Sequence, residues 1–290
     1  MSVTFGTEGW RAVMGKEFTI PNVRLVAQAI AEHYRAAAGR RGPVTMAVGY
    51  DTRAHSNAFA RTVSEVLAGN GIRVRLSDRT VPTCAVSRYV KDDALAAGVM
   101  ITASHNPPVY NGIKVKARYG GSATTEVVAA IERRIGRSAV KRLSFEDAVN
   151  TGLIRSVELL PRFLKGITSF VDLAAVRRAR LRVLVDSMHG AGDRYIERLL
   201  RGGRCRVETL RAERDPLFGA LAKWRPAKLA GLAVRAFSAM DGAKVTLADE
   251  SWLLFRRSGT EPIVRIYAET PTRSRLPELM RTGVRLARKG

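Results

Sequence analysis

The residues with the clearest chemical potential are Ser104 and His105, which follow a short apolar run. The run, residues 99–101, is partly β-branched, and two prolines close the loop after it, so we expect a buried strand that ends in a loop. A hydroxyl at the tip of a strand, beside an imidazole, is where an α/β fold holds a nucleophile. The alternative is that Ser104 and Asn106 only stabilise turns.

A second candidate site lies towards the C-terminal end of the sequence. It combines an arginine, two hydroxyls and a glycine within five residues: Arg256, Ser258, Gly259 and Thr260. A guanidinium, two hydroxyls and the backbone N–H groups of such a segment can surround a phosphate. The alternative is an ordinary hairpin turn, which needs the glycine but neither the arginine nor both hydroxyls. The composition therefore favours phosphate binding.

Other basic residues stand where they can act on a phosphate. Arg11 follows a loop with two glycines, which let the backbone approach a ligand closely. Arg53 directly follows a predicted strand. Lys114 and Lys116 alternate with apolar residues, which predicts a half-exposed strand with both ammonium groups on one face, near Ser104 in the chain.

Strands and helices alternate along the first half of the chain, which predicts a parallel sheet covered by helices. Asn22 and Ser56 are the expected N-caps of two of these helices, and Gly39 is expected to end the first. Because ligands bind beyond the carboxyl ends of parallel strands, Arg53 and Ser104 are expected to converge there. The predicted helices are 22–39, 56–69, 82–91 and 124–135, and the predicted strands, besides the one before Ser104, are 44–50 and 72–77.

The later part of the chain changes character. Residues 137–180 read as a connector with a helix over 156–171. A buried strand over 181–186, a helix to residue 200 and a strand over 205–210 form one βαβ unit, which is too small to be stable alone. The last segment predicts an α+β domain with an antiparallel sheet. Its strands are expected at 233–238, 244–247, 251–255 and 263–268, its turns at Asp241-Gly242 and Asp249-Glu250, and its helix at 275–288.

Composition limits the classes of function. The chain has 290 residues, 46% of them hydrophobic, and a formal charge of +23. Its 39 arginines and 10 lysines are dispersed, so nucleic-acid binding is the less favoured interpretation of this charge. No apolar run of about 18 residues predicts a membrane span. The start lacks the features of a signal peptide, and Cys84 and Cys205 match no metal spacing, which predicts free thiols and a cytoplasmic protein.

Several motifs together resemble the α-D-phosphohexomutases, the phosphoglucomutase/phosphomannomutase family. GVMITASHNPP at 98–108 resembles that family's active-site serine loop, and FGTEGWR at 5–11 its N-terminal loop. The segments 49–53, 111–114 and 185–192 also match, as does 256–269, which resembles the C-terminal phosphate loop. The resemblance implies a mixed or parallel α/β sheet domain followed by a small C-terminal α+β domain. We expect a first domain at 1–138, a connector and shortened second domain at 139–219, and the family's fourth domain at 220–290.

The resemblance also implies roles for the candidate residues. Ser104 would be the phosphoserine that donates its phosphoryl group to a hexose phosphate, and His105 would assist it. Lys114 and Arg11 would act as acid/base or charge-stabilising groups, with Arg53 in support. Arg256, Ser258, Gly259 and Thr260 would hold the substrate's distal phosphate. The cofactors implied are Mg²⁺ and, as activator, a hexose 1,6-bisphosphate.

The departures from the family pattern concern the metal and the sugar. The magnesium loop Asp-Gly-Asp-x-Asp-Arg and the sugar loop Gly-Glu-x-Ser-Gly are absent, and the break falls near residues 219–224. Of the metal ligands, only Ser104, through its phosphate, is left. A divalent ion contributes several kcal/mol to phosphoryl transfer, so we expect weakened turnover. The alternatives are an inactive relic or phosphosugar-binding protein, and a basic nucleic-acid-binding protein. A shortened second domain is also expected to expose an apolar edge and favour self-association.

Overall fold

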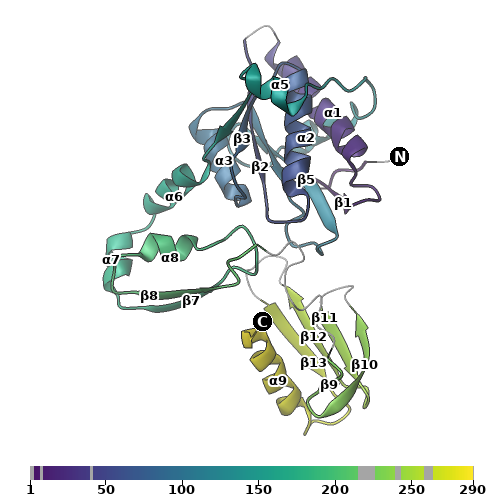
Figure 1. Cartoon of the computed structure of the whole chain (residues 1–290), viewed down its shortest axis with the longest axis vertical. Coiled ribbons are helices and arrows are strands. Elements are labelled where there is room, and N and C mark those ends of the chain that lie inside the picture. Colours follow the sequence, from purple (N-terminus) through teal and green to yellow (C-terminus); the bar gives the residue numbers. More distant parts are fainter. Residues whose placement is uncertain are drawn as a thin grey trace. The chain divides into compact units, whose positions relative to one another are not determined.

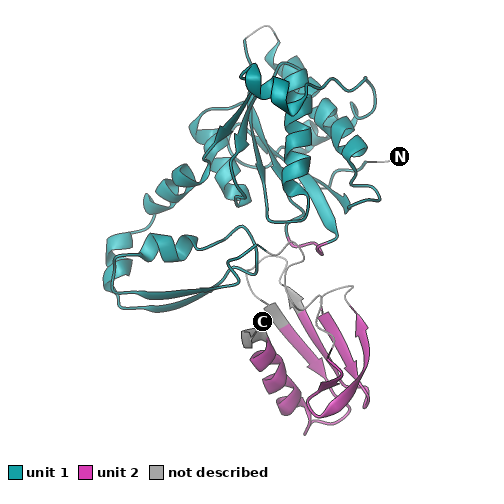
Figure 2. Cartoon of the chain, viewed as in Figure 1, with its two compact units in different colours: residues 1–104, 109–214 teal, residues 105–108, 215–290 magenta. Residues whose placement is uncertain are grey.

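A computed structural model describes residues 3–6, 9–39, 42–214, 226–238, 243–257 and 264–289. The chain forms two compact units (Figure 2). The first contains residues 1–104 and 109–214, and the second contains residues 105–108 and 215–290. Among the described residues, no helix is long and apolar enough to cross a membrane.

A mixed six-stranded sheet forms the centre of the first unit (Figure 1). Strands β3, β2, β4 and β6 run parallel, whereas β5 runs antiparallel to both β4 and β1. This confirms the predicted mixed or parallel sheet. In spatial order the strands are β1 (Trp10–Val13), β5 (Tyr110–Ala117), β4 (Ala97–Ile101), β2 (Thr45–Tyr50), β3 (Arg73–Ser77) and β6 (Ile154–Val157).

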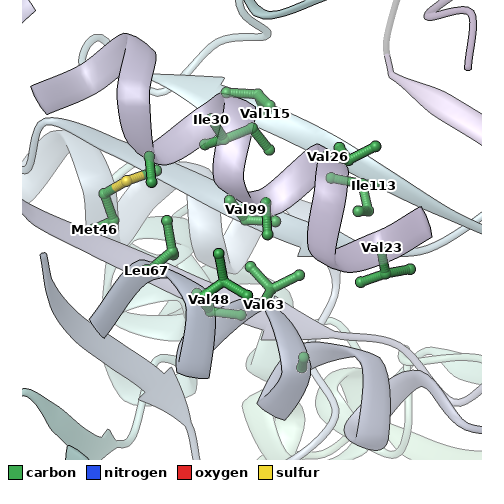
Figure 3. Packing of buried hydrophobic residues seen from close by; sticks show 14 of the residues in the cluster. Val23, Val26, Ile30, Met46, Val48, Val63, Leu67, Val99, Ile113 and Val115 are labelled. Carbon is green, nitrogen blue, oxygen red and sulfur yellow. The ribbon is translucent and has the colours of Figure 1, made fainter. Parts of the chain in front are cut away.

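Helices cover both faces of this sheet. On one face, α1 (Ile20–Ala38) and α2 (Ser56–Gly69) pack side by side, with α4 (Thr125–Glu132) and α5 (Phe145–Asn150) against them. On the other face lie α3 (Thr83–Asp92) and α6 (Leu160–Thr168). Figure 3 shows the first layer, in which apolar side chains of α1 and α2 meet those of the strands: Val23, Val26, Ile30, Met46, Val48, Val63, Leu67, Val99, Ile113 and Val115.

Two glycines let α3 lie close to the sheet. A Cβ built on Gly49 would lie 2.4 Å from Val86 Cγ2, and one on Gly98 would lie 2.7 Å from Val90 Cγ2. Because real Cβ atoms do not approach this closely, larger residues would push α3 outward. This close packing helps to fix β2 and β4, whose ends carry candidate residues.

Several local predictions need correction. Thr19, not Asn22, caps α1, because its hydroxyl accepts from the Asn22 backbone N–H at 3.5 Å. Asn22 is buried inside the helix and donates to the Glu17 carbonyl at 2.6 Å. Ser56 is the first residue of α2 rather than its cap, and its hydroxyl donates to Asp51 instead. Gly39, with φ of 54°, ends α1 as expected.

Strand β5 is buried on both faces, so the expectation of a half-exposed strand was wrong. Its lysines, Lys114 and Lys116, are only 6% and 8% exposed. The alternation of lysine with apolar residues is typical of a strand with one solvent-exposed face. Here, however, α3 packs over the face that carries the lysines. The Lys116 ammonium donates to the Ser122 hydroxyl at 3.1 Å.

The connector contains a strand where one long helix was predicted over residues 156–171. β6 pairs in parallel with β3, and α6 begins only at Leu160, with Pro161 in its first turn. The physical reason is that β3 would otherwise be an open edge, which β6 closes by burying Ile154 in the core. The apolar residues after this strand recur at helical spacing, so the predicted helix was extended back into the strand.

A small βαβ segment completes the first unit. It consists of α7 (Leu173–Arg178), β7 (Arg182–Asp186), α8 (Tyr195–Leu200) and β8 (Arg206–Leu210), with β7 parallel to β8. The expectation of a buried strand was wrong, because Leu184 is 64% exposed. In the part of the chain that the structure describes, α8 packs against β8. Self-association through this segment stays a prediction.

In its described residues, the second unit is an antiparallel sheet with a helix packed on it, as predicted. The sheet has five strands, because the short strand β9 adds to the four that were predicted. Its core contains Val245, Leu247, Leu253, Phe255 and Leu279. The turn at Asp249-Glu250 is present, with Glu250 at φ of 64°, whereas Asp241-Gly242 lies outside the described residues. The elements, in the spatial order of the sheet, are β13 (Val264–Glu269), β12 (Trp252–Arg257), β11 (Ala243–Leu247), β10 (Leu232–Ser238) and β9 (Lys228–Leu229), with α9 (Leu276–Lys289) packed on β12 and β13.

Candidate functional site

The serine loop lies at the carboxyl end of β4, beside the loop that follows β2. These parallel strands are adjacent, and Tyr50 is paired with Ile101 at their ends. Ser104 is exposed and has φ of 54°, in the left-handed region. Its backbone is held on both sides: its N–H donates to Thr102 Oγ1 at 2.9 Å, and its carbonyl accepts from Arg53 Nη2 at 2.7 Å. The chain thus presents the serine hydroxyl on a fixed backbone.

Arg53 is the buried cation that joins the two loops. Its side chain is completely buried, and its Nε lies 3.3 Å from Asp51 Oδ2. Nη1 donates to the Tyr110 carbonyl at 3.1 Å, while Nη2 binds the Ser104 carbonyl. The planar guanidinium suits this task because its donors have fixed directions. Arg53 therefore holds the backbone of Ser104, and its predicted supporting role in catalysis stays a prediction.

Asp51 organises the same loops from the other side. Its Oδ1 accepts from the Arg53 backbone N–H at 3.0 Å and from the Ser56 hydroxyl at 2.8 Å. Its Oδ2 accepts from the Thr102 hydroxyl at 2.6 Å. Both oxygens are thus occupied by donors of the protein. Asp51 is therefore suited to positioning the loops.

Asn111 ties β5 to the loop after β2. Its amide nitrogen donates to the Ala54 carbonyl at 3.2 Å and to the Ser56 hydroxyl at 2.9 Å. Its amide oxygen accepts from the Gly112 N–H at 2.9 Å. Because Asn111 is fully buried, satisfying these groups is energetically important.

Arg11 and Lys114 share one face of the sheet near this loop. Arg11 pairs with Gly112 across β1 and β5, and Lys114 stands two residues further along β5. A Cβ on Gly112 would lie 3.0 Å from Arg11 Cγ and 2.7 Å from the Thr102 carbonyl. The missing side chain at Gly112 therefore leaves room for the Arg11 stem beside the start of the serine loop. The structure brings Arg11, Arg53, Lys114 and Ser104 to one end of the sheet.

The remaining predicted residues are not placed with this group. His105 is exposed and belongs to the segment 105–108, which is grouped with the second unit. Ser258, Gly259 and Thr260 lie outside the described residues. The backbone of Arg256 pairs with Arg265 near the end of β12, while its side chain also lies outside the description. The roles predicted for these residues stay predictions.

The described residues do not fit a magnesium site. Within them, no group of three or more His, Cys, Asp or Glu side chains could hold a metal ion. Asp51, which follows strand β2, already accepts three hydrogen bonds from donors of the protein. Both cysteines are free thiols.

Four residues that hold the loops around Ser104 were not predicted from the sequence. They are Asp51, Thr102, Asn111 and Arg214, which donates to the Thr52 and Arg53 carbonyls. The first two were detectable, because each directly follows the end of one of two parallel strands. Asn111 lies in the segment 111–114, which was used only as a match to the phosphohexomutase family and not as a structural signal. Arg214 had no local signal, since it contacts residues more than 160 positions away.

Family models match most of the chain. The model for "Phosphoglucomutase/phosphomannomutase, alpha/beta/alpha domain I" matches residues 2–141, and that for domain II matches residues 161–248. The fold and the serine loop define a phosphohexomutase-type α/β protein. The chain belongs to the α-D-phosphohexomutase family, the phosphoglucomutase/phosphomannomutase group. The domain II match continues beyond residue 219, so the predicted domain boundaries stay predictions.

Individual relatives agree with this assignment. A phosphoglucomutase of Komagataeibacter xylinus is 30% identical over 231 residues, covering 74% of this chain and 41% of the relative. A phosphoglucosamine/phosphogalactosamine mutase of Sulfurisphaera tokodaii is 30% identical over 220 residues, covering 76% and 47%. The chain thus spans about half the length of these relatives. A crystal structure from Thermus thermophilus, assigned as a phosphomannomutase, has a TM-score of 0.67 at 22% identity, covering 99% and 100%, which supports the fold.

Proposed function

We propose that the chain is an intramolecular phosphotransferase that interconverts hexose 1-phosphate and hexose 6-phosphate through a phosphoserine at Ser104. The observation that carries this proposal is the backbone of Ser104. Its left-handed conformation, fixed by Thr102 and Arg53, presents an exposed hydroxyl at the end of a parallel strand. Phosphoryl transfer depends mainly on positioning and on offsetting charge, and both are supported by this arrangement.

The reaction consists of two phosphoryl transfers. In the first, the P–Oγ bond of phosphorylated Ser104 breaks, a P–O bond to the sugar hydroxyl forms, and the hydroxyl proton ends on Ser104 Oγ. In the second, the other phosphoryl group of the resulting bisphosphate returns to Ser104 Oγ, and that proton passes to the sugar oxygen set free. A hexose 1,6-bisphosphate added from solution would prime the serine by the second step alone.

Cationic residues supply the charge that these transfers need. Arg11 and Lys114 share the sheet face near Ser104, where they would stabilise the equatorial oxygens of the phosphoryl group. Lys114 and His105 are the proposed proton carriers. Arg256, Ser258, Gly259 and Thr260 would hold the phosphate that is not reacting. Mg²⁺ is implied by the family, but the described residues offer no ligand set for it, so none of these steps uses it.

Product formation tests the proposal. The purified chain is incubated with glucose 1-phosphate, a trace of glucose 1,6-bisphosphate and Mg²⁺, and glucose 6-phosphate is measured. We expect product from the native chain and from Ser138→Ala, an exposed serine used as a matched control. Ser104→Ala should give none, and mass spectrometry should find phosphate on Ser104 of the native chain. No product above background, together with no phosphate on Ser104, would refute the proposal.

A second candidate is a phosphosugar-binding protein without turnover. The lack of a metal-ligand cluster among the described residues favours it. Calorimetry with glucose 6-phosphate distinguishes the two: binding to a chain that never forms product or phosphoserine supports this candidate and excludes the mutase.

A further inference from the structure

We infer that Arg214, which follows the last strand of the small βαβ segment, is a positioning residue for Ser104. Its Nε donates to the Thr52 carbonyl at 3.0 Å, and its Nη2 donates to the Arg53 carbonyl at 3.1 Å. One guanidinium thus spans two consecutive carbonyls of the loop after β2. The catalytic consequence of this contact rests on the proposed function, whereas the positioning itself does not.

The contact reaches Ser104 through a single intermediate residue. Arg214 holds the main chain of Arg53, and the Arg53 side chain in turn donates to the Ser104 carbonyl at 2.7 Å. Asp51 fixes the same loop from the side of β4, through the Arg53 N–H and the Thr102 hydroxyl. The loop is therefore held on one side by Asp51 and on the other by Arg214.

The residues just before Arg214 are held by the end of β7 and the loop after it. Arg211 forms an ion pair with Asp186, whose Oδ1 lies 2.9 Å from Arg211 Nε. The His189 backbone N–H donates to the Arg211 carbonyl at 2.8 Å, and His189 Nδ1 lies 3.0 Å from the Glu213 carbonyl oxygen. These contacts fix residues 211–213 beside the loop that follows β7, directly before Arg214.

This arrangement gives the βαβ segment a role in the site. Its two strands and two short helices contribute none of the predicted chemical groups. Arg214, four residues after the end of β8, nevertheless binds the loop that supports Ser104. Without Arg214, the carbonyls of Thr52 and Arg53 lose charge-assisted hydrogen bonds. The main chain of Arg53, which positions its guanidinium, is then held less firmly. A displacement of about 1 Å at a reacting group can cost ~100-fold in rate.

The test compares Arg214→Met with Arg206→Met. Arg206 is exposed on β8 of the same segment, so its variant makes the same change in charge without a described side-chain contact. Arg214→Lys keeps the charge but can donate to only one carbonyl at a time. Two readouts are used. The first is hydrogen–deuterium exchange of peptides covering residues 51–56 and 102–104. The second is the rate of Ser104 phosphorylation over a range of glucose 1,6-bisphosphate concentrations up to saturation.

We expect faster exchange of both peptides in Arg214→Met, an intermediate rate in Arg214→Lys and no change in Arg206→Met. Phosphorylation of Ser104 should slow by ~10–100-fold in Arg214→Met, with the half-saturating bisphosphate concentration nearly unchanged. Unchanged exchange in Arg214→Met overturns the inference, as do equal effects in Arg206→Met. If the native chain never takes phosphate at Ser104, the proposed function fails, while the exchange comparison still decides the positioning role.

Discussion

Replacing Arg53 by methionine removes the buried cation that joins the two loops of the site. The change leaves the Asp51 carboxylate, which is 13% exposed, without its counter-charge. It also removes the donors to the Ser104 and Tyr110 carbonyls. Methionine fills part of the volume, so the main loss is electrostatic.

The expected loss is large because both partners lie within the fold. Removing one member of a buried ion pair costs about 3–5 kcal/mol. In a unit of about 200 residues, each kcal/mol lowers the melting temperature by ~2–4 °C, so we expect a decrease of ~6–20 °C. Arg53→Lys keeps the charge but not the three directed contacts, and should fall between the native chain and Arg53→Met.

Trp10 provides a probe that reports on the first unit. It is 3% exposed and packs against Phe18, with ring centroids 4.7 Å apart. With Trp224 and Trp252 replaced by phenylalanine, urea unfolding followed by Trp10 fluorescence measures the stability of this unit. Arg73→Met, an exposed arginine on β3, is the matched control and should change stability by less than about 0.5 kcal/mol. A decrease of less than about 1 kcal/mol in the free energy of unfolding of Arg53→Met would refute the assigned role, because breaking a buried ion pair is expected to cost more.

Three further perturbations test the packing around the site. Gly112→Ala places a Cβ 2.7 Å from the carbonyl oxygens of Thr102 and Trp10, and should lower the free energy of unfolding in urea by ~1–3 kcal/mol. Gly192→Ala is the control and should not have this effect, because its Cβ would lie 3.7 Å from the nearest atom given for it. Thr102→Val removes the bonds to Asp51 and to the Ser104 N–H, and should cost ~1–3 kcal/mol in the same assay, with an unchanged melt contradicting it. Burial, followed by the nearby Tyr119, raises the pKa of Tyr34 from 10.0 to about 12. Its stabilising contribution is therefore present below pH 10 and lost as the pH rises through 12. The tyrosinate absorbance change near pH 12 should fall by the share of one tyrosine in Tyr34→Phe, and the rest should stay because the pKa of Tyr195 is also raised to about 12. A loss of absorbance change near pH 10 instead would contradict the burial of Tyr34.

The convergence of Arg53 and Ser104 was predictable because it follows from local patterns. Each residue follows an apolar run of strand length, and alternation with helices predicts parallel strands whose carboxyl ends meet. Neither inference needs a contact between distant segments. The sheet class and the terminal antiparallel domain were predictable for the same reason.

The burial of Lys114 and Lys116 was not predictable from alternation alone. A strand with one charged face reads as half-exposed, and only the tertiary structure places α3 over that face. The same limit applies to β6, whose four residues become a strand because the edge of β3 is available. Arg214 lies further beyond local reasoning, since its partners are more than 160 residues away.

The strained backbone of Ser104 shows why these distant contacts matter for the proposed reaction. A left-handed conformation costs a non-glycine residue about 1–2 kcal/mol. The bond from the Ser104 N–H to Thr102 contributes about 0.5–1.5 kcal/mol, and the charged donor Arg53 contributes about 1.5–3 kcal/mol through the Ser104 carbonyl. Together they offset the strain. The serine is therefore held in its exposed conformation by the fold itself, and weakening Arg53 should release Ser104 before it unfolds the sheet.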